Sequence, residues 1–231
     1  PESQAAQYML ATLGAAETPT ESPADYVVSV FDTYAENFDQ HLVERLNYRT
    51  PEALFEAVKS YLPAGSAINI ADLGCGTGLC GVYLRPIAKK LIGIDLSPKM
   101  LEKARDRNIY DDLIAANVVA GLDKADMRFD LTVAADVFVY IGDLRATFEA
   151  CMRALEPGGV FAFSVESTNQ AVTYLLNSSG RYAHSACYIR GLANDFELET
   201  VCVKSVVLRE ELSQPVRGEI YVLRRSGAGN G

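Results

Sequence analysis

The sequence has few of the residues that build metal centres. It contains only two histidines and five cysteines, and no two cysteines stand at C-x-x-C spacing. A structural zinc site needs such clustered ligands, so we predict no metal. The cysteines, at positions 75, 80, 151, 187 and 202, are dispersed and odd in number. This usage predicts reduced, buried thiols in a cytoplasmic protein.

Positive charge and long apolar runs are also scarce. Asp and Glu number 30 against 21 Lys and Arg, which gives a formal net charge of −9 at pH 7. Nucleic acids and anionic membranes attract clustered Lys and Arg, so this balance argues against both as partners. No apolar stretch reaches the length of a membrane span, and no basic segment followed by an apolar one opens the sequence. We therefore expect a small-molecule partner.

A glycine-rich turn between two apolar runs is what the sequence does have. Residues 68–78 read Ile-Asn-Ile-Ala-Asp-Leu-Gly-Cys-Gly-Thr-Gly, and a second apolar run ends in Asp95. This order predicts a strand, a loop, a helix and a parallel strand, a unit that binds adenosine-containing ligands. Glycines let the backbone approach a ligand where a Cβ would clash. Asp95, at the end of the second strand, is placed to accept hydrogen bonds from ribose hydroxyls.

Two adenosine ligands compete for this loop. Residues 76–81 match G-x-G-x-x-G, the fingerprint of dinucleotide sites, which seat a pyrophosphate on a helix amino terminus. S-adenosylmethionine (SAM) carries a sulfonium, an ammonium and a carboxylate instead. Asp72 puts a negative charge two residues before the first glycine. That charge suits the cationic end of SAM and repels a pyrophosphate, so SAM is preferred and a nicotinamide dinucleotide is the alternative.

The rest of the pattern predicts an α/β domain of residues 24–231 behind a helix and linker in residues 1–23. Residues 24–62 read as a helical extension, with apolar residues from Tyr26 to Leu42 and Leu46 at helical spacing. A second helix is expected to begin after Thr50 as its N-cap. Alternating strands and helices predict a mostly parallel sheet with an antiparallel edge. We expect strands near 67–72, 90–95, 112–117, 128–136, 158–166, 196–208 and 216–224, and helices near 3–13, 78–86, 98–107, 143–155 and 184–194.

Four motifs resemble those of the Rossmann-like (class I) SAM-dependent methyltransferases. Residues 72–78 resemble the first motif of that family, 93–101 the second, 129–136 the fourth, and 155–160 the turn before the fifth strand. The resemblance implies a doubly wound sheet of seven strands in the order 3-2-1-4-5-7-6. It also implies SAM as the cofactor, S-adenosylhomocysteine (SAH) as the product, and in-line methyl transfer that depends on positioning.

A narrower resemblance links the chain to predicted methyltransferases that carry tetratricopeptide repeats at the amino end. It rests on residues 31–42, 179–185 and 207–209. Residues 3–13 would then be the tail of a repeat, and a missing upstream repeat region could bind a protein partner. A single helix is no functional repeat array, because repeats need stacked neighbours.

The family resemblance assigns most of the cofactor contacts. For the methionine part we expect Asp72 to face the ammonium through water or the loop amides, and Gly74, Cys75, Gly76 and Gly78 to line the loop. The nucleoside contacts expected are Asp95 on the ribose, with Leu96, Met100, Asn117 and Val118 around the adenine. Ala135 and Asp136 are expected to face the transferred methyl group, and Tyr34 and Phe38 to close over the cofactor.

The acceptor site is less defined by the sequence. His184 and Tyr140 are candidate catalytic residues, since histidine titrates near neutral pH and suits a general base. Arg181 and Tyr182 could bind an acidic small substrate. We predict methylation of a small molecule on O, N or C. The alternatives are an NAD(P)-dependent oxidoreductase and a SAM-binding interaction module without turnover.

Overall fold

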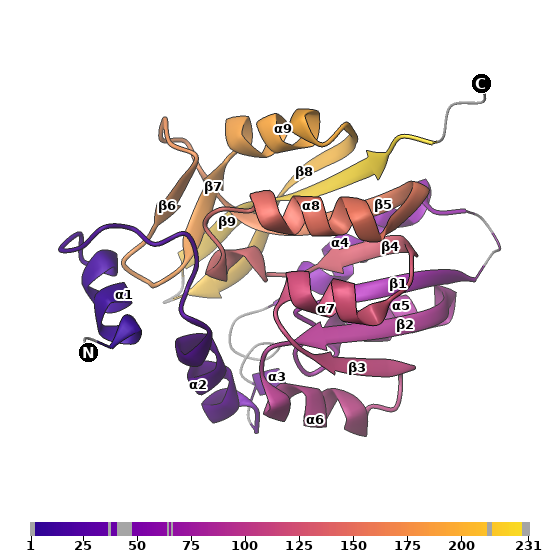
Figure 1. Cartoon of the computed structure of the whole chain (residues 1–231), viewed down its shortest axis with the longest axis horizontal. Coiled ribbons are helices and arrows are strands. Elements are labelled where there is room, and N and C mark those ends of the chain that lie inside the picture. The colour runs from indigo at the N-terminus through magenta and orange to yellow at the C-terminus, as the bar shows by residue number, and fades with distance from the viewer. Residues whose placement is uncertain are drawn as a thin grey trace.

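The computed structural model describes residues 3–36, 38–40, 48–63, 65, 67–211 and 214–227. Within these residues, nine strands form one sheet (Figure 1). The strands are β1 (Ile68–Leu73), β2 (Ala88–Asp95), β3 (Asp112–Ala115), β4 (Phe129–Ala134), β5 (Leu155–Thr168), β6 (Tyr174–Leu176), β7 (Tyr182–Ser185), β8 (Leu198–Glu211) and β9 (Gln214–Arg225).

The centre of the sheet has the predicted strand order. β3, β2, β1, β4 and β5 are parallel neighbours in that order. β9 then pairs antiparallel with β5, and β8 pairs antiparallel with β9. Counted without β6 and β7, this is the order 3-2-1-4-5-7-6 with an antiparallel edge. The α/β fold class predicted from the sequence is therefore confirmed.

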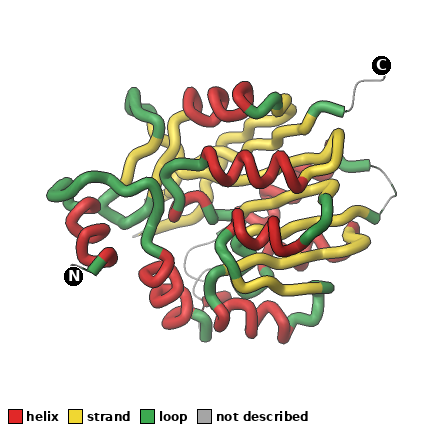
Figure 2. The backbone as a smooth tube through the Cα atoms, in the orientation of Figure 1, coloured by secondary structure: helices red, strands yellow, loops and turns green. Residues whose placement is uncertain are grey.

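Helices cover both faces of the sheet, as the tube view shows (Figure 2). Their bounds are α1 (Gln4–Thr12), α2 (Ala24–Tyr34), α3 (Phe38–Gln40), α4 (Thr50–Val58), α5 (Leu79–Leu84), α6 (Pro98–Asp106), α7 (Val118–Ala125), α8 (Arg145–Ala154) and α9 (Ala186–Asp195), with short 3-10 turns η2 (Lys59–Tyr61), η3 (Arg85–Ile87) and η4 (Phe138–Tyr140). None of the helices in the described residues is both long and apolar enough to cross a bilayer.

Each face of the sheet has its own apolar core. On one side, β-strand residues pack with α7, α8 and α9 around Leu122, Phe148 and Leu192. On the other side, Leu54 and Val58 of α4 and Leu84 of α5 pack against the reverse face of the same strands. Because both faces of the sheet are covered, every residue of β1 and β4 is buried except the partly exposed Asn69 and Asp130.

The amino-terminal residues pack against the β6–β7 hairpin, at the edge of the sheet opposite β3 in the strand order. The Tyr8 hydroxyl of α1 donates to the Gly180 carbonyl at 2.8 Å and packs near the ring of Tyr182, which is fully buried. The chain then crosses the domain, where the Thr20 carbonyl accepts from the amides of Gly142 and Asp143. Residues 3–22 thus lie along the same edge of the molecule as the β6–β7 hairpin (Figure 1).

Three local predictions need correction. Thr50 is the first residue of α4 and not its N-cap, because its hydroxyl donates to the Leu208 carbonyl at 3.1 Å. Helix α7 was not predicted, and neither was the β6–β7 hairpin, whose strands are three and four residues long. Strands that short show no usable alternation. The predicted helical positions Leu42 and Leu46 lie outside the described residues.

Candidate cofactor and acceptor site

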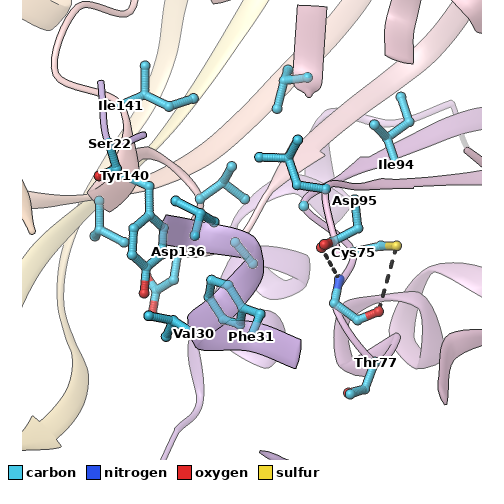
Figure 3. A pocket seen from close by; sticks show the side chains of 18 of the residues that line it. Ser22, Val30, Phe31, Cys75, Thr77, Ile94, Asp95, Asp136, Tyr140 and Ile141 are labelled. Atoms are coloured by element: carbon cyan, nitrogen blue, oxygen red, sulfur yellow. Dashed lines mark hydrogen bonds between the residues drawn. The ribbon is translucent and has the colours of Figure 1, made fainter. Parts of the chain in front are cut away.

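A cavity of about 410 Å³ opens at the carboxyl ends of β1, β2 and β4, beneath α2. This is the edge at which parallel α/β sheets bind ligands. The cavity has two ends (Figure 3). Cys75, Thr77, Ile94 and Asp95 line what we call the donor end, and Asp136 with Tyr140 lines what we call the acceptor end.

The glycine loop requires the backbone that only glycine adopts easily. Gly74, Gly76 and Gly78 have φ values of 61°, 54° and 92°, in the left-handed region. A Cβ on Gly74 would also lie 2.5 Å from Cγ2 of Val137. Gly74 and Gly76 line the cavity, whereas Gly78 lies behind its wall as the N-cap of α5. The loop therefore presents backbone, not side chains, to a ligand.

Asp95 connects the end of β2 to the glycine loop. Its Oδ2 accepts a hydrogen bond from the Gly76 amide at 2.8 Å, and its Oδ1 accepts from the Ser97 amide at 2.8 Å (Figure 3). Burial raises the pKa of this carboxyl, and the two backbone hydrogen bonds oppose the rise. Each carboxylate oxygen keeps a further lone pair, so Asp95 can accept two ribose hydroxyls while its own position is fixed.

The expected adenine contacts divide into two groups. Leu96, Asn117 and Val118 line the cavity. The Asn117 side-chain oxygen, however, accepts from the Ala120 amide at 2.8 Å as the N-cap of α7, which makes it a weaker candidate for the adenine amino group. Met100 is fully buried in α6 behind the wall, and it does not belong to the lining described here.

Asp72 lies beneath the glycine loop and not in the cavity wall. It is fully buried, and its Oδ2 accepts from the Tyr110 hydroxyl at 2.6 Å. Burial raises the pKa of Asp72 to about 7, although the hydrogen bond from Tyr110 lowers it. The carboxyl is therefore held by Tyr110 beneath the loop, and its expected interaction with a SAM ammonium through water or the loop amides stays a prediction.

Helices α2 and α3 form a lid over the cavity, defined here as residues 24–40 without residue 37. Val30, Phe31, Tyr34 and Phe38 of this lid line the cavity, and the Phe31 ring meets the Tyr140 ring edge-on at 5.4 Å between centroids. Tyr34 and Phe38 come from two helices and not from one as expected, and their closure over a cofactor stays a prediction.

Acidic residues hold the lid to the donor end. Asp32 accepts from the Ser97 hydroxyl at 2.6 Å, and Asp39 accepts from the Thr77 hydroxyl and pairs with Arg107. The sequence analysis missed these contacts. Asp32 and Asp39 are seven residues apart on a helical pattern, which was the available signal.

Asp136 follows β4 in a conformation that is unusual for a side-chain-bearing residue. Its φ is 56°, a left-handed value that non-glycine residues hold only when their surroundings fix them. Ser164 of β5 fixes it twice. The Asp136 amide donates to the Ser164 oxygen at 2.9 Å, and the Ser164 hydroxyl donates to Asp136 Oδ1 at 2.9 Å. Burial raises the pKa of Asp136, and nearby Arg209 lowers it.

A buried ionic network surrounds Asp136. Arg209 of β8 is 4% exposed; its Nε donates to Glu211 at 2.7 Å and its Nη2 to Glu166. Arg181 pairs with the same oxygen of Glu211. Arg209 and Arg181 line the cavity. The role of Arg209 was not predicted, and the only signal was a charged residue directly after the apolar run 206–208.

The structure separates the four acceptor candidates. Tyr140 and Arg181 line the cavity. Tyr182 is fully buried against α1, and its hydroxyl donates to the Pro19 carbonyl at 2.8 Å. His184 is buried behind the wall, with Nε2 at 3.0 and 3.1 Å from the carbonyls of Ile141 and Gly142. Burial lowers its pKa to about 4. The proposal of His184 as a general base and Tyr182 as a substrate contact is corrected, because both are used in packing.

Comparison with known proteins points to one enzyme class. The family model described as a methyltransferase domain matches residues 71–163. Malonyl-[acyl-carrier protein] O-methyltransferase of Salmonella typhimurium is 30% identical over 138 residues, which cover 60% of this chain and 52% of that protein. The 18S rRNA (guanine-N(7))-methyltransferase of Bos taurus is 36% identical over 72 residues, covering 31% and 26%. The chain thus spans about half the length of the Salmonella typhimurium protein and about a quarter of the Bos taurus protein.

Solved structures share the fold. The 1,6-didemethyltoxoflavin-N1-methyltransferase of Burkholderia thailandensis, crystallised with its substrate and SAH, superposes with a TM-score of 0.66 at 15% identity, covering 91% of this chain and 93% of that one. Residues 71–163 are thus similar to a methyltransferase domain, and the sheet that contains them has the strand order expected for the class I methyltransferase fold.

Proposed function

We propose that the protein transfers a methyl group from SAM to a small-molecule acceptor held in the same cavity. One observation carries the proposal: the glycine loop and Asp95 meet at the donor end, and the same cavity continues to the polar acceptor end at Asp136. Donor and acceptor can therefore lie side by side. An interaction module without turnover would need only the first of these two ends.

The chemistry asks for positioning more than for a reactive side chain. When bound, SAM supplies an activated methyl group on a positively charged sulfur. The loop backbone, Asp95 and the lid would orient it, and such orientation contributes roughly 7–11 kcal/mol in well-organised systems. Burial raises the pKa of the Cys75 and Cys80 thiols far above neutrality. Both cysteines are therefore neutral and unsuited to act as nucleophiles.

The binding test compares the two adenosine ligands. Isothermal calorimetry with SAM, SAH, NADH and NADPH should show uptake of SAM and SAH only. Ligand at 100 times its Kd should also raise the unfolding free energy by about 2.7 kcal/mol. Uptake of NADH without SAM would instead support the oxidoreductase alternative.

Turnover needs a separate test, because a binding module would also take up SAM. The protein is incubated with methyl-labelled SAM and an extract of small metabolites. We expect label in a small organic product. Absence of a labelled product from broad extracts would support the module.

A small acceptor fits this protein better than a nucleic acid does. The net charge of −9 disfavours a phosphate backbone, and the similarity to the rRNA methyltransferase covers only 31% of the chain. The free cysteines support a cytoplasmic location. The half-exposed Met9 and Leu10 and the more exposed Leu13 of the first helix segment support an upstream repeat packed there.

A further inference from the structure

The acceptor end combines apolar walls with a charged group of residues, which we call the floor and which consists of Asp136, Arg181 and Arg209. Val30 and Phe31 of the lid and Val139 and Ile141 of the segment after β4 supply apolar wall. Asp136, Arg181 and Arg209 supply the charges of the floor, and Glu21 lies in the wall beside Ile141. An occupant therefore needs a mostly apolar body and one polar group, and the charges of the floor decide what that group is.

Both arginines of the floor already have acidic partners. Arg209 is bonded to Glu166 and Glu211, and Arg181 is paired with Glu211. These two cations and two glutamates balance one another. Asp136 is the third carboxylate, and Nη1 of Arg209 lies 3.6 Å from its Oδ2. The cluster thus carries one negative charge in excess, and that charge belongs to the group that faces the cavity.

A carboxylate acceptor would add a fourth negative charge to two positive ones in a partly desolvated site, which is unfavourable. A group with an N–H or O–H bond would instead donate to Asp136. Ser164 donates to Oδ1, and Thr50 also forms a hydrogen bond with this carboxyl. Each carboxylate oxygen accepts more than one hydrogen bond, so Oδ2 can still accept one from a substrate.

Resting on the proposed function, we infer that the acceptor is an amine or hydroxyl compound with a largely apolar body, and that Asp136 is its general base. The acceptor lone pair forms the new bond to the methyl carbon as the carbon–sulfur bond breaks, and that electron pair stays on sulfur in SAH. The acceptor proton moves to Asp136 Oδ2 and then to water.

Arg209 is a positioning residue for Asp136. It comes from β8, is almost fully buried, and brings Glu166 of β5 and Glu211 into one network with Asp136 of the β4 end. Its cation stabilises the ionised base. Arg181 also lowers the pKa of Asp136. The hydroxyls of Tyr48 and Tyr140 are neutral, because burial raises the pKa of each. The carboxylates of Glu166 and Asp136 repel each other.

The test uses three probes of similar size on SAH-saturated protein: 2-phenylethylamine, 2-phenylethanol and 3-phenylpropionate. Calorimetry should show the amine binding at least tenfold more tightly than the propionate, with the alcohol between them. Asp136→Asn should weaken amine binding at least tenfold and leave SAH affinity within about threefold. The control is Glu199→Gln, an exposed acid of β8 outside the cavity and the network, which should leave amine affinity unchanged.

Tighter binding of the propionate, or no binding of any probe at millimolar concentration, overturns the inference. Failure of the proposed function looks different, because SAM and SAH themselves would not bind. If Asp136→Asn does not fold, Ser164→Ala provides the second variant. It frees Oδ1 of Asp136 and should weaken amine binding several-fold in a protein with an unchanged circular dichroism spectrum.

The role of Arg209 is read from pH dependence. Amine affinity should fall at acid pH as Asp136 becomes protonated. Arg209→Gln removes the stabilising cation, so this fall should move to higher pH, and Arg209→Lys should restore most of the original profile. An Arg209→Gln variant that lowers affinity equally at every pH would contradict the positioning role.

Discussion

The donor and acceptor ends of the cavity are built in different ways. The donor end comes from neighbouring segments: the loop after β1 and the end of β2 are joined by the bond from Gly76 to Asp95. The acceptor end draws on Asp136 after β4, Arg181 before β7 and Arg209 near the end of β8. Local backbone geometry dictates the first, and long-range charge pairing dictates the second. Changes at one end should therefore leave the other largely intact.

Asp95→Ala should produce the largest effect, confined to the donor end. It removes a carboxylate able to accept two ribose hydroxyls, and hydrogen bonds to a charged group contribute about 1.5–3 kcal/mol each. We expect SAM affinity to fall a hundredfold or more in calorimetry. Asp106→Ala, an exposed acid at the end of the neighbouring helix, is the control. An unchanged affinity in Asp95→Ala would refute the ribose contact.

Gly74→Ala tests the loop backbone, and its loss of unfolding free energy should be somewhat smaller than the loss of binding free energy in Asp95→Ala. Both Gly74 and Gly158 have positive φ, but a Cβ meets Val137 at 2.5 Å only in the first case and nothing within 4 Å in the second. Alanine in a left-handed conformation costs roughly 1–2 kcal/mol, and overpacking adds about 1–3 kcal/mol. Urea unfolding should show a larger loss for Gly74→Ala than for Gly158→Ala, and equal losses would contradict the close contact.

His184, buried behind the acceptor end, should make the stability of the folded protein depend on pH. Its pKa is about 4 in the folded protein against about 6.5 unfolded. The unfolded state therefore binds the proton first, and stability is lost as the pH falls below 6.5. Between pH 7 and 5 this loss amounts to about 2 kcal/mol.

The pH dependence is measured by urea unfolding of the wild type and of His184→Gln, which keeps an N–H donor for the Ile141 and Gly142 carbonyls. The variant should lose less stability than the wild type on acidification. The same slope in both proteins would show that His184 is not the titrating group.

Asp39→Asn should give the smallest effect, at the donor end. It weakens the contacts of the lid with Thr77 and Arg107, but partly exposed ion pairs contribute only about 0–1 kcal/mol. We expect SAM affinity to fall by up to about fivefold, less at high salt. Glu36→Gln, which breaks a more exposed pair with Lys103, should change affinity less. A larger effect from Glu36→Gln would contradict this order.

Where the structure differs from the sequence predictions, the side chain in question makes a contact with a residue far away in the sequence. Asp72 was placed by its position before the glycines, and its hydrogen bond from the Tyr110 hydroxyl was not foreseen. His184 seemed a base because histidine titrates near neutrality, yet burial keeps it neutral although its hydrogen bonds to two backbone carbonyls raise its pKa. Thr50 seemed an N-cap, yet it bonds to Leu208. In each case the residue type was informative and the partner was not visible.

The sequence by itself determined the glycine loop and the acid at the end of β2, and its resemblance to a known family supplied the order of the central strands. Apolar runs specify buried parallel strands, and a left-handed backbone requires glycine wherever it occurs. Only the tertiary structure decided the acceptor end. Arg209, Asp136 and Glu166 come together because β8, β4 and β5 belong to one sheet, and charges so far apart along the chain leave no pattern in the sequence that connects them.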